Sequence, residues 1–173
     1  MSEPSPSPEY EYIPDPMREA WAGFLQRWQW DWFATLTFRG DPHPEKADKL
    51  FRVWVSKLNR KLYGVRWATH GKGVRWARAS EPQKRGTIHY HVLMGGDGLA
   101  DQRRLDWMDR WFKLGGIARI EVPESASAVS GYCSKYVVKG GEIDLSSTLG
   151  RPVQHGLYKA PPFRCARHRK VGR

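Results

Sequence analysis

Two histidines lie one residue apart in an otherwise apolar run, GTIHYHVLMGG, at residues 86–96. If this run is a strand, alternate side chains point to opposite faces, so His89 and His91 share one face and Tyr90 lies on the other. Their β-carbons would be about 7 Å apart, because a strand rises about 3.3 Å per residue. Two imidazoles at this separation can bind one divalent metal ion. They could equally be two polar residues on the solvent side of a strand.

The sequence also brings a carboxylate close to this pair. Residues 73–81 (GVRWARASE) and 87–94 (TIHYHVLM) are predicted strands, and the short link PQKRG between them is turn-like. An antiparallel hairpin would place Glu81 beside the two histidines. Two imidazoles and a carboxylate form a mixed nitrogen and oxygen site that can hold a divalent ion and leave positions open for substrate. The alternative is that Glu81 is only a carboxylate at the end of a strand.

A second group of reactive side chains lies in YCSKYVVK, residues 132–139. On a helix, four of these side chains fall within an arc of about 100°: Tyr132, Lys135, Tyr136 and Lys139. A phenol is a weak nucleophile at neutral pH, but a neighbouring ammonium group favours the phenolate, which can attack a phosphodiester. A divalent ion on the same phosphate would neutralise the developing charge, so the two groups together could cleave a nucleic-acid strand. The alternative is an ordinary polar helix face.

Hydrophobic periodicity predicts the elements that must position these groups. Helices are predicted at residues 17–28, 45–63, 101–116 and 123–141, and strands at residues 31–38, 73–81, 87–94 and 117–122. After the first helix the order is β-α-β-β-α-β-α. This order predicts an α+β fold, with a ferredoxin-like or RRM-like central antiparallel sheet and helices packed on one face. We expect a disordered segment at residues 1–16, one folded domain at residues 17–160 and a basic tail at residues 161–173.

The composition narrows the class of partner. The net charge is +11, from 29 Lys and Arg against 18 Asp and Glu. A balance this basic favours a polyanionic partner, of which nucleic acid is the commonest. The chain has no apolar run of membrane-spanning length and no signal-peptide pattern, and its two cysteines make no disulfide framework. These features predict a cytoplasmic protein that binds nucleic acid.

Three motifs, in this order, resemble those of the HUH endonucleases, which include the replication initiators, relaxases and transposases that nick single-stranded DNA. FATLTF (33–38) resembles the first motif of rolling-circle replication initiators. HYH (89–91) is similar to the histidine–hydrophobic–histidine signature of the family. YCSK (132–135) resembles the tyrosine motif of initiators from circular single-stranded DNA viruses. The longer YCSKYVVK resembles the two-tyrosine YxxKYxxK motif of small-phage and plasmid initiators.

The resemblance implies a specific chemistry. It implies Mg²⁺ or Mn²⁺ held by His89, His91 and Glu81. It implies attack by a tyrosine on DNA, which leaves a 5′-phosphotyrosine and a free 3′-OH. Tyr132 matches the viral pattern and Tyr136 the second position of the two-tyrosine pattern, so both are candidate nucleophiles.

The resemblance also implies a substrate, which is single-stranded DNA at a replication origin. Lys84 and Arg85, in the hairpin turn beside the histidines, are placed to contact its phosphates. The chain has no P-loop motif, so a host helicase, in a prokaryotic cell, is the expected partner for unwinding. Two alternatives remain open: an HUH single-strand transposase, and a non-catalytic nucleic-acid-binding module on an RRM-like fold. The second would leave the histidine pair, Glu81 and the tyrosine–lysine face as coincidences.

Overall fold

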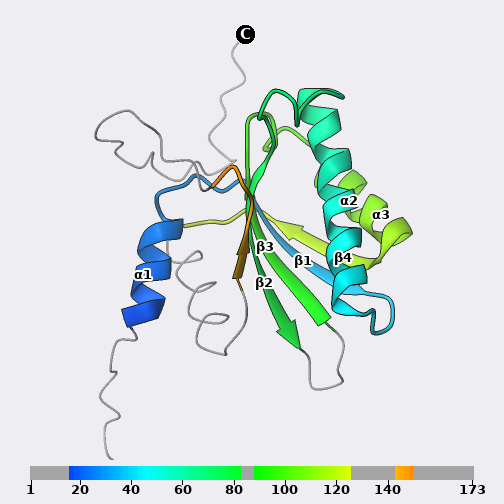
Figure 1. Cartoon of the computed structure of the whole chain (residues 1–173), viewed down its shortest axis with the longest axis horizontal. Helices are drawn as coiled ribbons and strands as arrows, with labels where there is room; N and C mark the ends of the chain where they lie inside the picture. Colours follow the sequence, from blue (N-terminus) through cyan, green and yellow to red (C-terminus); the bar gives the residue numbers. More distant parts are fainter. Residues whose placement is uncertain (1–15, 83–87, 126–142, 150–173) are drawn as a thin grey trace, which may run out of the picture.

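The strands of the chain form one sheet with helices packed on it (Figure 1). The computed structural model describes residues 16–82, 88–125 and 143–149. The elements in these ranges are α1 (Pro16–Leu25), β1 (Trp32–Phe38), α2 (Pro44–Tyr63), β2 (Arg75–Pro82), β3 (Ile88–Gly95), α3 (Arg104–Leu114), β4 (Gly116–Glu121) and β5 (Ile143–Leu145). The sheet order is β4-β1-β3-β2-β5, and every neighbouring pair is antiparallel. No helix in these ranges is long and apolar enough to cross a membrane.

The predicted α+β fold is confirmed. From β1 to β4 the chain runs β-α-β-β-α-β, with β1 and β3 in the middle of the sheet, as in a ferredoxin-like arrangement. Two features differ from the prediction. The short edge strand β5 was not predicted, and the predicted helix at residues 123–141 lies almost entirely outside the described residues. The predicted domain limits of 17 and 160 stay a prediction.

The alternation of β1 determines which face of the sheet is buried under α2 and α3. Its larger apolar residues recur with a period of two, so they all point to one face. These buried residues are Trp32, Ala34, Leu36 and Phe38. The residues between them point to the other face and are only half-buried: Phe33, Thr35 and Thr37. One strand therefore supplies a core face and a polar face.

Signals at the ends of α2 and α3 explain where these helices stop. Pro44 occupies the first helical position of α2, where its missing N–H removes no helical hydrogen bond. Gly64 follows α2 with φ 82°, and its N–H donates to the carbonyl of Arg60. Gly115 follows α3 and donates to the carbonyl of Trp111 at 2.8 Å. Both helices therefore end at a glycine.

Buried tryptophans join α2 and α3 to each other and to the sheet. The ring of Trp54, on α2, packs edge-on against Trp107 and Trp111 of α3. The Trp54 indole donates to the carbonyl of Trp107 at 3.0 Å, and that of Trp111 donates to the carbonyl of Thr37 at 3.2 Å. These indole nitrogens keep a hydrogen-bond partner inside an apolar core, which removes the cost of burying them.

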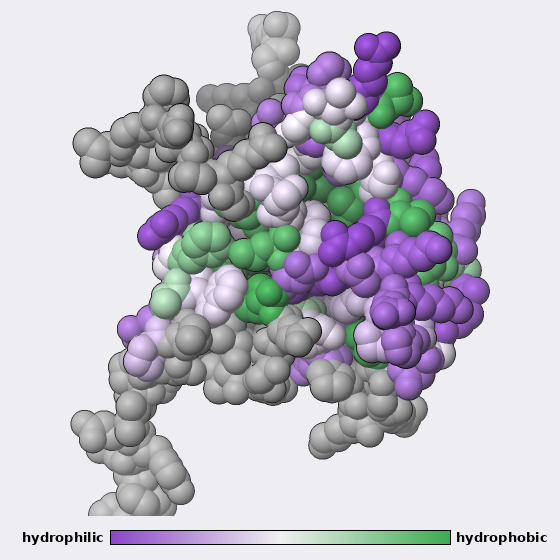
Figure 2. Space-filling view, in the orientation of Figure 1, coloured by the Kyte–Doolittle hydropathy of each residue, from purple (hydrophilic) through white to green (hydrophobic). Residues whose placement is uncertain are grey.

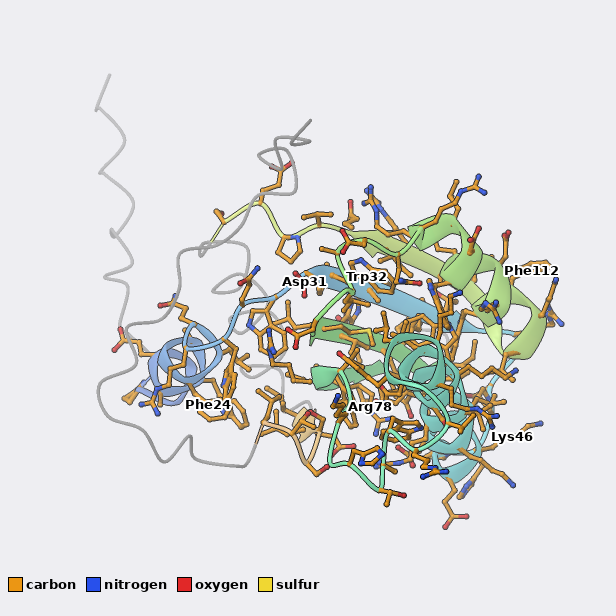
Figure 3. All side chains as sticks on the ribbon, turned by 90° about the horizontal axis from the view of Figure 1, so that it is seen from above. Phe24, Asp31, Trp32, Lys46, Arg78 and Phe112 are labelled. Atoms are coloured by element: carbon orange, nitrogen blue, oxygen red, sulfur yellow. The ribbon has the colours of Figure 1, made fainter. Side chains whose placement is uncertain are left out.

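The opposite face of the sheet has its own, smaller cluster beside α1. Leu25 at the end of α1 and Trp30 after it pack with Ala77 and Leu93 of the sheet. The strands lie between α1 and the pair α2 and α3 (Figures 1 and 3). Leu93 is two residues beyond His91, so α1 borders the part of this face that carries the histidines.

Candidate active site

The two histidines lie on β3, which has β1 on one side and β2 on the other. The predicted alternation is confirmed, because Tyr90 is buried against Phe38 and Phe51 on the face under the helices. His89 and His91 therefore point to the other face, into a stretch of sheet formed by three strands. A position on a central strand fixes the backbone on both sides, which suits a site that must hold its side chains in place.

His91 has protein contacts on both ring nitrogens and on one ring face. Its Nε2 lies 3.2 Å from a carboxylate oxygen of Glu81, and its Nδ1 lies 3.3 Å from the hydroxyl of Thr35. The ring of Phe33 stacks on it, with 6.2 Å between ring centroids and 15° between planes. The His91 side chain is only 9% exposed. These contacts hold the imidazole in one orientation.

His89 is placed by the same two neighbouring strands. Its Nδ1 lies 3.3 Å from the hydroxyl of Thr37, and its backbone pairs with Glu81 across the hairpin. Burial lowers the pKa of His89, and the charge of Glu81 opposes this lowering. A lowered pKa favours the neutral imidazole, which is the form that binds a metal ion.

Glu81 lies beside both histidines, as the hairpin prediction required. It is the register partner of His89 and forms an ion pair with His91. Its side chain is 23% exposed, so it lies at the boundary between the sheet and solvent. One face of the hairpin thus carries two imidazoles and one carboxylate.

The donor types at this face fit a hard or borderline divalent cation. The threonine contacts use Nδ1 of each ring, so Nε2 is the nitrogen that a metal ion would take. Across residues 16–82, 88–125 and 143–149, however, no group of three or more His, Cys, Asp or Glu side chains is arranged closely enough to hold a metal ion. The predicted ligand set of Glu81, His89 and His91 therefore stays a prediction.

Thr35 and Thr37 were not predicted to contact the histidines. The sequence carries a signal for these contacts, because the two threonines alternate with the same period of two as the two histidines. The register between β1 and β3 pairs Thr35 with His91 and Thr37 with His89. That register joins residues far apart in the chain, and no local pattern in the sequence determines it.

The same face continues onto the edge strand β4. The register pairs Thr37 with Ile117 and Thr35 with Arg119. Ile117 is 66% exposed, which is unusual for an isoleucine in a strand, and Arg119 forms an exposed ion pair with Glu121 at 2.8 Å. An exposed apolar side chain and an arginine therefore flank the histidines on the β1 side.

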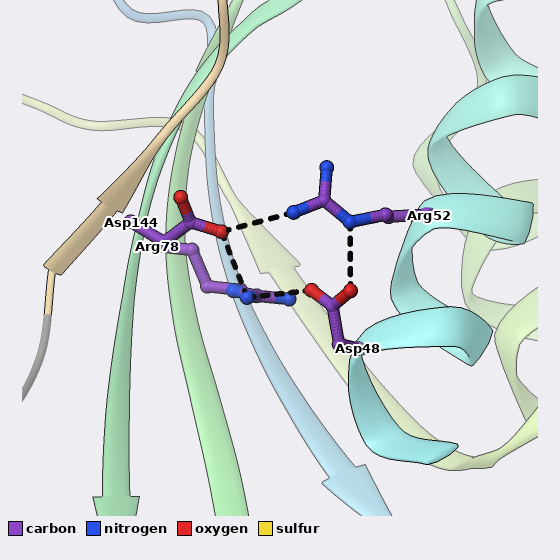
Figure 4. A network of polar contacts seen from close by, with 4 residues as sticks. All are labelled: Asp48, Arg52, Arg78 and Asp144. Carbon is purple, nitrogen blue, oxygen red and sulfur yellow. Dashed lines mark hydrogen bonds and ion pairs between the residues drawn. The ribbon is translucent and has the colours of Figure 1, made fainter. Parts of the chain in front are cut away.

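A second polar cluster lies on the other face, between α2 and the sheet (Figure 4). Arg78 of β2 is 10% exposed and forms ion pairs with Asp48 at 2.8 Å and Asp144 at 2.9 Å. Arg52 contacts both carboxylates, at 2.7 and 3.4 Å. The rings of Phe51 and Tyr90 lie over the Arg78 guanidinium. This cluster ties α2, β2 and β5 together and is separated from the histidines by the sheet.

The pKa of Asp48 reflects this cluster. Partial burial alone would raise the pKa of this carboxyl group. The hydrogen bonds and positive charges of Arg52 and Arg78 outweigh burial and hold the pKa below its ordinary value. Asp48 is therefore a charged structural partner at neutral pH and no candidate for proton transfer there.

The remaining predicted site residues lie outside the described residues. They are the hairpin-turn residues Lys84 and Arg85 and the group Tyr132, Lys135, Tyr136 and Lys139. Their roles in catalysis and DNA contact stay predictions.

Comparison with known proteins gives one match. Residues 31–141 match the sequence model of a family described as replication-associated protein ORF2. The matched segment begins just before β1 and includes Glu81, both histidines and both candidate tyrosines. No curated protein and no solved structure gives a significant match.

Proposed function

Because the chain belongs to this family of replication-associated proteins, and so has a role in replication initiation, we propose that it is an HUH-type rolling-circle replication initiator. In this proposal it nicks single-stranded DNA at an origin and later rejoins it. The working compartment is the cytoplasm of a prokaryotic host, where a host helicase unwinds the duplex.

One observation carries the proposal. Glu81, His89 and His91 share one face of the two central hairpin strands, inside the segment that matches the family. An RRM-like binding module uses the surface of such strands for exposed aromatic rings that stack on bases. Here the positions carry metal-ligand types instead, and each histidine has a threonine hydroxyl on its Nδ1.

We assign the metal site to these three residues, with Mg²⁺ or Mn²⁺ as the ion. When bound, the ion would polarise a non-bridging oxygen of the target phosphate and neutralise developing charge. The chain's own contribution is orientation: Thr35 and Thr37 fix the two rings by Nδ1, and burial keeps His89 neutral. Lys84 and Arg85, in the adjoining turn, would hold the phosphates on either side.

The proposed reaction is a transesterification. The phenolate of Tyr132 or Tyr136 attacks the phosphorus, a bond from phosphorus to the tyrosine oxygen forms, and the bond to the 3′ oxygen breaks. Lys135 and Lys139 favour the phenolate, and one of them donates the proton that the leaving 3′ oxygen takes up. Rejoining is the reverse reaction, with the 3′-OH as nucleophile. Neither direction needs water or an oxidant.

Two other functions would use the same face. A single-strand transposase would share the chemistry but would join its cut ends to a new site, whereas an initiator rejoins them to each other. A non-catalytic binding module would retain DNA without cutting it. Metal dependence of cleavage separates the module from the two enzymes.

The decisive experiment is a denaturing gel with a pool of labelled single-stranded DNA, in Mn²⁺ and in EDTA. We expect an adduct that survives denaturation, forms only with metal and maps by mass spectrometry to the peptide containing residues 132–136. Tyr132→Phe and Tyr136→Phe test each nucleophile, and an adduct that survives in the double variant would exclude both. His91→Ala should abolish the adduct but leave DNA retention in a native gel largely intact. Retention of DNA by the wild type with no cleavage of a cognate origin would instead favour the module.

A further inference from the structure

The outer face of α2 carries an unbroken group of positive charges. Five basic residues on this helix are exposed to solvent, and we call them the α2 stripe: Lys46, Lys49, Lys57, Arg60 and Lys61. At about 100° per residue they fall within an arc of about 120°. At about 1.5 Å per residue the stripe is about 22 Å long. A rigid helix therefore holds five cations in one line.

The acidic residues of α2 lie off the stripe. Asp48 points toward the sheet, where it pairs with Arg52 and Arg78. Glu45 lies in the first turn, 3.9 Å from His43. Within the described part of the chain, no carboxylate forms an ion pair with any residue of the stripe.

The other exposed helix on this side has a different charge pattern. On α3 and its first cap, basic residues alternate with acidic ones, and Arg103 pairs with Asp106 at 3.5 Å. Asp109 lies in the same helix as Arg110 and Lys113. The comparison matters because an ordinary solvated helix face carries both signs of charge, as α3 does, whereas the α2 stripe carries one.

The stripe and the histidines lie on opposite sides of the sheet. α2 packs on the face that buries Tyr90, and the histidines point to the other face. Figure 3 shows Lys46 on the outside of α2 and Arg78 between α2 and the strands. In Figure 2 the hydrophilic residues gather on the side of the molecule where Figure 1 draws α2. A strand in the proposed cleavage site therefore cannot lie on the stripe at the same point.

From this arrangement we infer that the α2 stripe binds the phosphate backbone of duplex DNA. Proteins that bind single strands combine cations with exposed aromatic rings for base stacking. The aromatic residues of α2 do not serve this purpose, because Phe51 and Trp54 are fully buried and Tyr63 is half-buried. A straight row of cations without aromatics matches sequence-independent contact with the regular phosphates of a duplex.

This inference rests on the replication role and on the DNA binding proposed above, but it does not require cleavage. It assigns two DNA surfaces to one domain. The histidine face takes the single strand that is cut, and the α2 stripe takes the adjoining duplex.

The test compares two triple variants with the same change in net charge. The stripe variant is Lys49→Gln, Lys57→Gln and Arg60→Gln, and the control on α3 is Arg103→Gln, Arg110→Gln and Lys113→Gln. Glutamine has nearly the same helix propensity as lysine and arginine, so both variants should fold, and circular dichroism checks this. Binding of a random-sequence duplex and of a single strand is measured in EDTA, over a range of salt concentrations.

We expect the stripe variant to bind the duplex at least about tenfold more weakly than wild type at low salt. The slope of log K against log salt concentration should fall by about 2.7, since each phosphate contact contributes about 0.9 for duplex DNA. The control should change both quantities much less, and single-strand binding should be nearly unchanged in the stripe variant. Equal losses for duplex and single strand, equal losses in the control, or no loss at all would each overturn the inference.

Failure of the cleavage proposal would be seen separately. The denaturing gel on single-stranded DNA in Mn²⁺ should give the same adduct for the stripe variant as for wild type. If wild type forms no adduct, the proposed nicking is wrong while the duplex measurement still stands.

Discussion

The hydroxyls of Thr35 and Thr37 each contact the Nδ1 atom of one histidine. Such contacts around a metal site orient the ligand rings, and their loss typically lowers metal affinity by about 10–100-fold. We predict that Thr35→Val lowers Mn²⁺ affinity within this range, since valine keeps the shape and loses the hydroxyl. Isothermal titration calorimetry on the folded protein measures the affinity directly.

The conservative variant distinguishes orientation from packing. Thr35→Ser keeps the hydroxyl and should retain most of the wild-type Mn²⁺ affinity, although it loses a methyl group. A purely structural role predicts the opposite order, with Ser more disruptive than Val. Equal affinities in wild type, Val and Ser variants would mean that the hydroxyl does not position His91 for metal.

At the scale of elements, the junction of α3 and β4 depends on one glycine. Gly116 has φ 156°, and a β-carbon there would overlap the carbonyl oxygen of Thr37, which belongs to the neighbouring strand. We predict that Gly116→Ala lowers the free energy of unfolding by about 2–3 kcal/mol, because both the backbone conformation and the close contact resist a side chain. Urea denaturation monitored by tryptophan fluorescence measures this loss.

Gly23, on the exposed side of α1, is the matched control. A β-carbon there would meet nothing within 4 Å. Gly23→Ala should leave stability unchanged or raise it by up to about 1 kcal/mol, since alanine favours the helix. A loss at Gly23 as large as that at Gly116 would refute the steric explanation.

The ion-pair cluster between α2 and the sheet makes stability depend on pH. The pKa of Asp48 is lower in the folded protein than its ordinary value of 3.8, because Arg52 and Arg78 outweigh the effect of burial. A lowered carboxyl pKa contributes stability that is complete well above the unfolded pKa and is lost as the pH falls through the folded pKa. The difference in free energy of unfolding between wild type and Asp48→Asn should therefore be constant near neutral pH and shrink below about pH 4.

Urea denaturation at a series of pH values tests this, with Glu45→Gln as the control on the same helix. Glu45 is almost fully exposed and its partner His43 is 3.9 Å away, so its removal should give no comparable pH dependence. A wild-type to Asp48→Asn difference that stays flat through the acid range, down to about pH 2, would contradict the prediction.

The sequence predicts elements with strong periodicity and misses those that depend on distant partners. The alternation in β1 and β3 is sufficient to place Tyr90 in the core and both histidines on the other face, and the short turn is sufficient to bring Glu81 beside them. β5 has three residues and pairs with β2, which lies much earlier in the chain, so no local pattern reveals it. The contacts of Thr35 and Arg78 likewise depend on registers and packing that only the folded sheet defines.

At the scale of the whole molecule, two surfaces of different character lie on opposite sides of one sheet. The face with the histidines carries few charges and is built to hold a small group of side chains, whereas the α2 stripe carries five cations. An origin that presents duplex beside single strand can occupy both surfaces at once, and the second contact then forms within the complex already made. Binding to both should exceed the affinity for either part alone.

This arrangement predicts how binding depends on the form of the DNA. A junction of duplex and single strand should bind wild type at least about tenfold more tightly than an equimolar mixture of the separate duplex and strand, because linked sites gain effective concentration. The advantage should require enough unpaired nucleotides to pass from α2 around the sheet, so junctions with single strands of increasing length should show a threshold followed by a plateau. Fluorescence anisotropy in EDTA measures this without cleavage.

The two triple variants provide the control for the junction measurement. The stripe variant Lys49→Gln, Lys57→Gln and Arg60→Gln should bind the junction no better than the single strand, because it has lost the surface that holds the duplex. The α3 control should keep the advantage. If the stripe variant kept the full junction advantage, the duplex would have to contact another part of the chain, and the separation of the two surfaces by the sheet would have no role in origin binding.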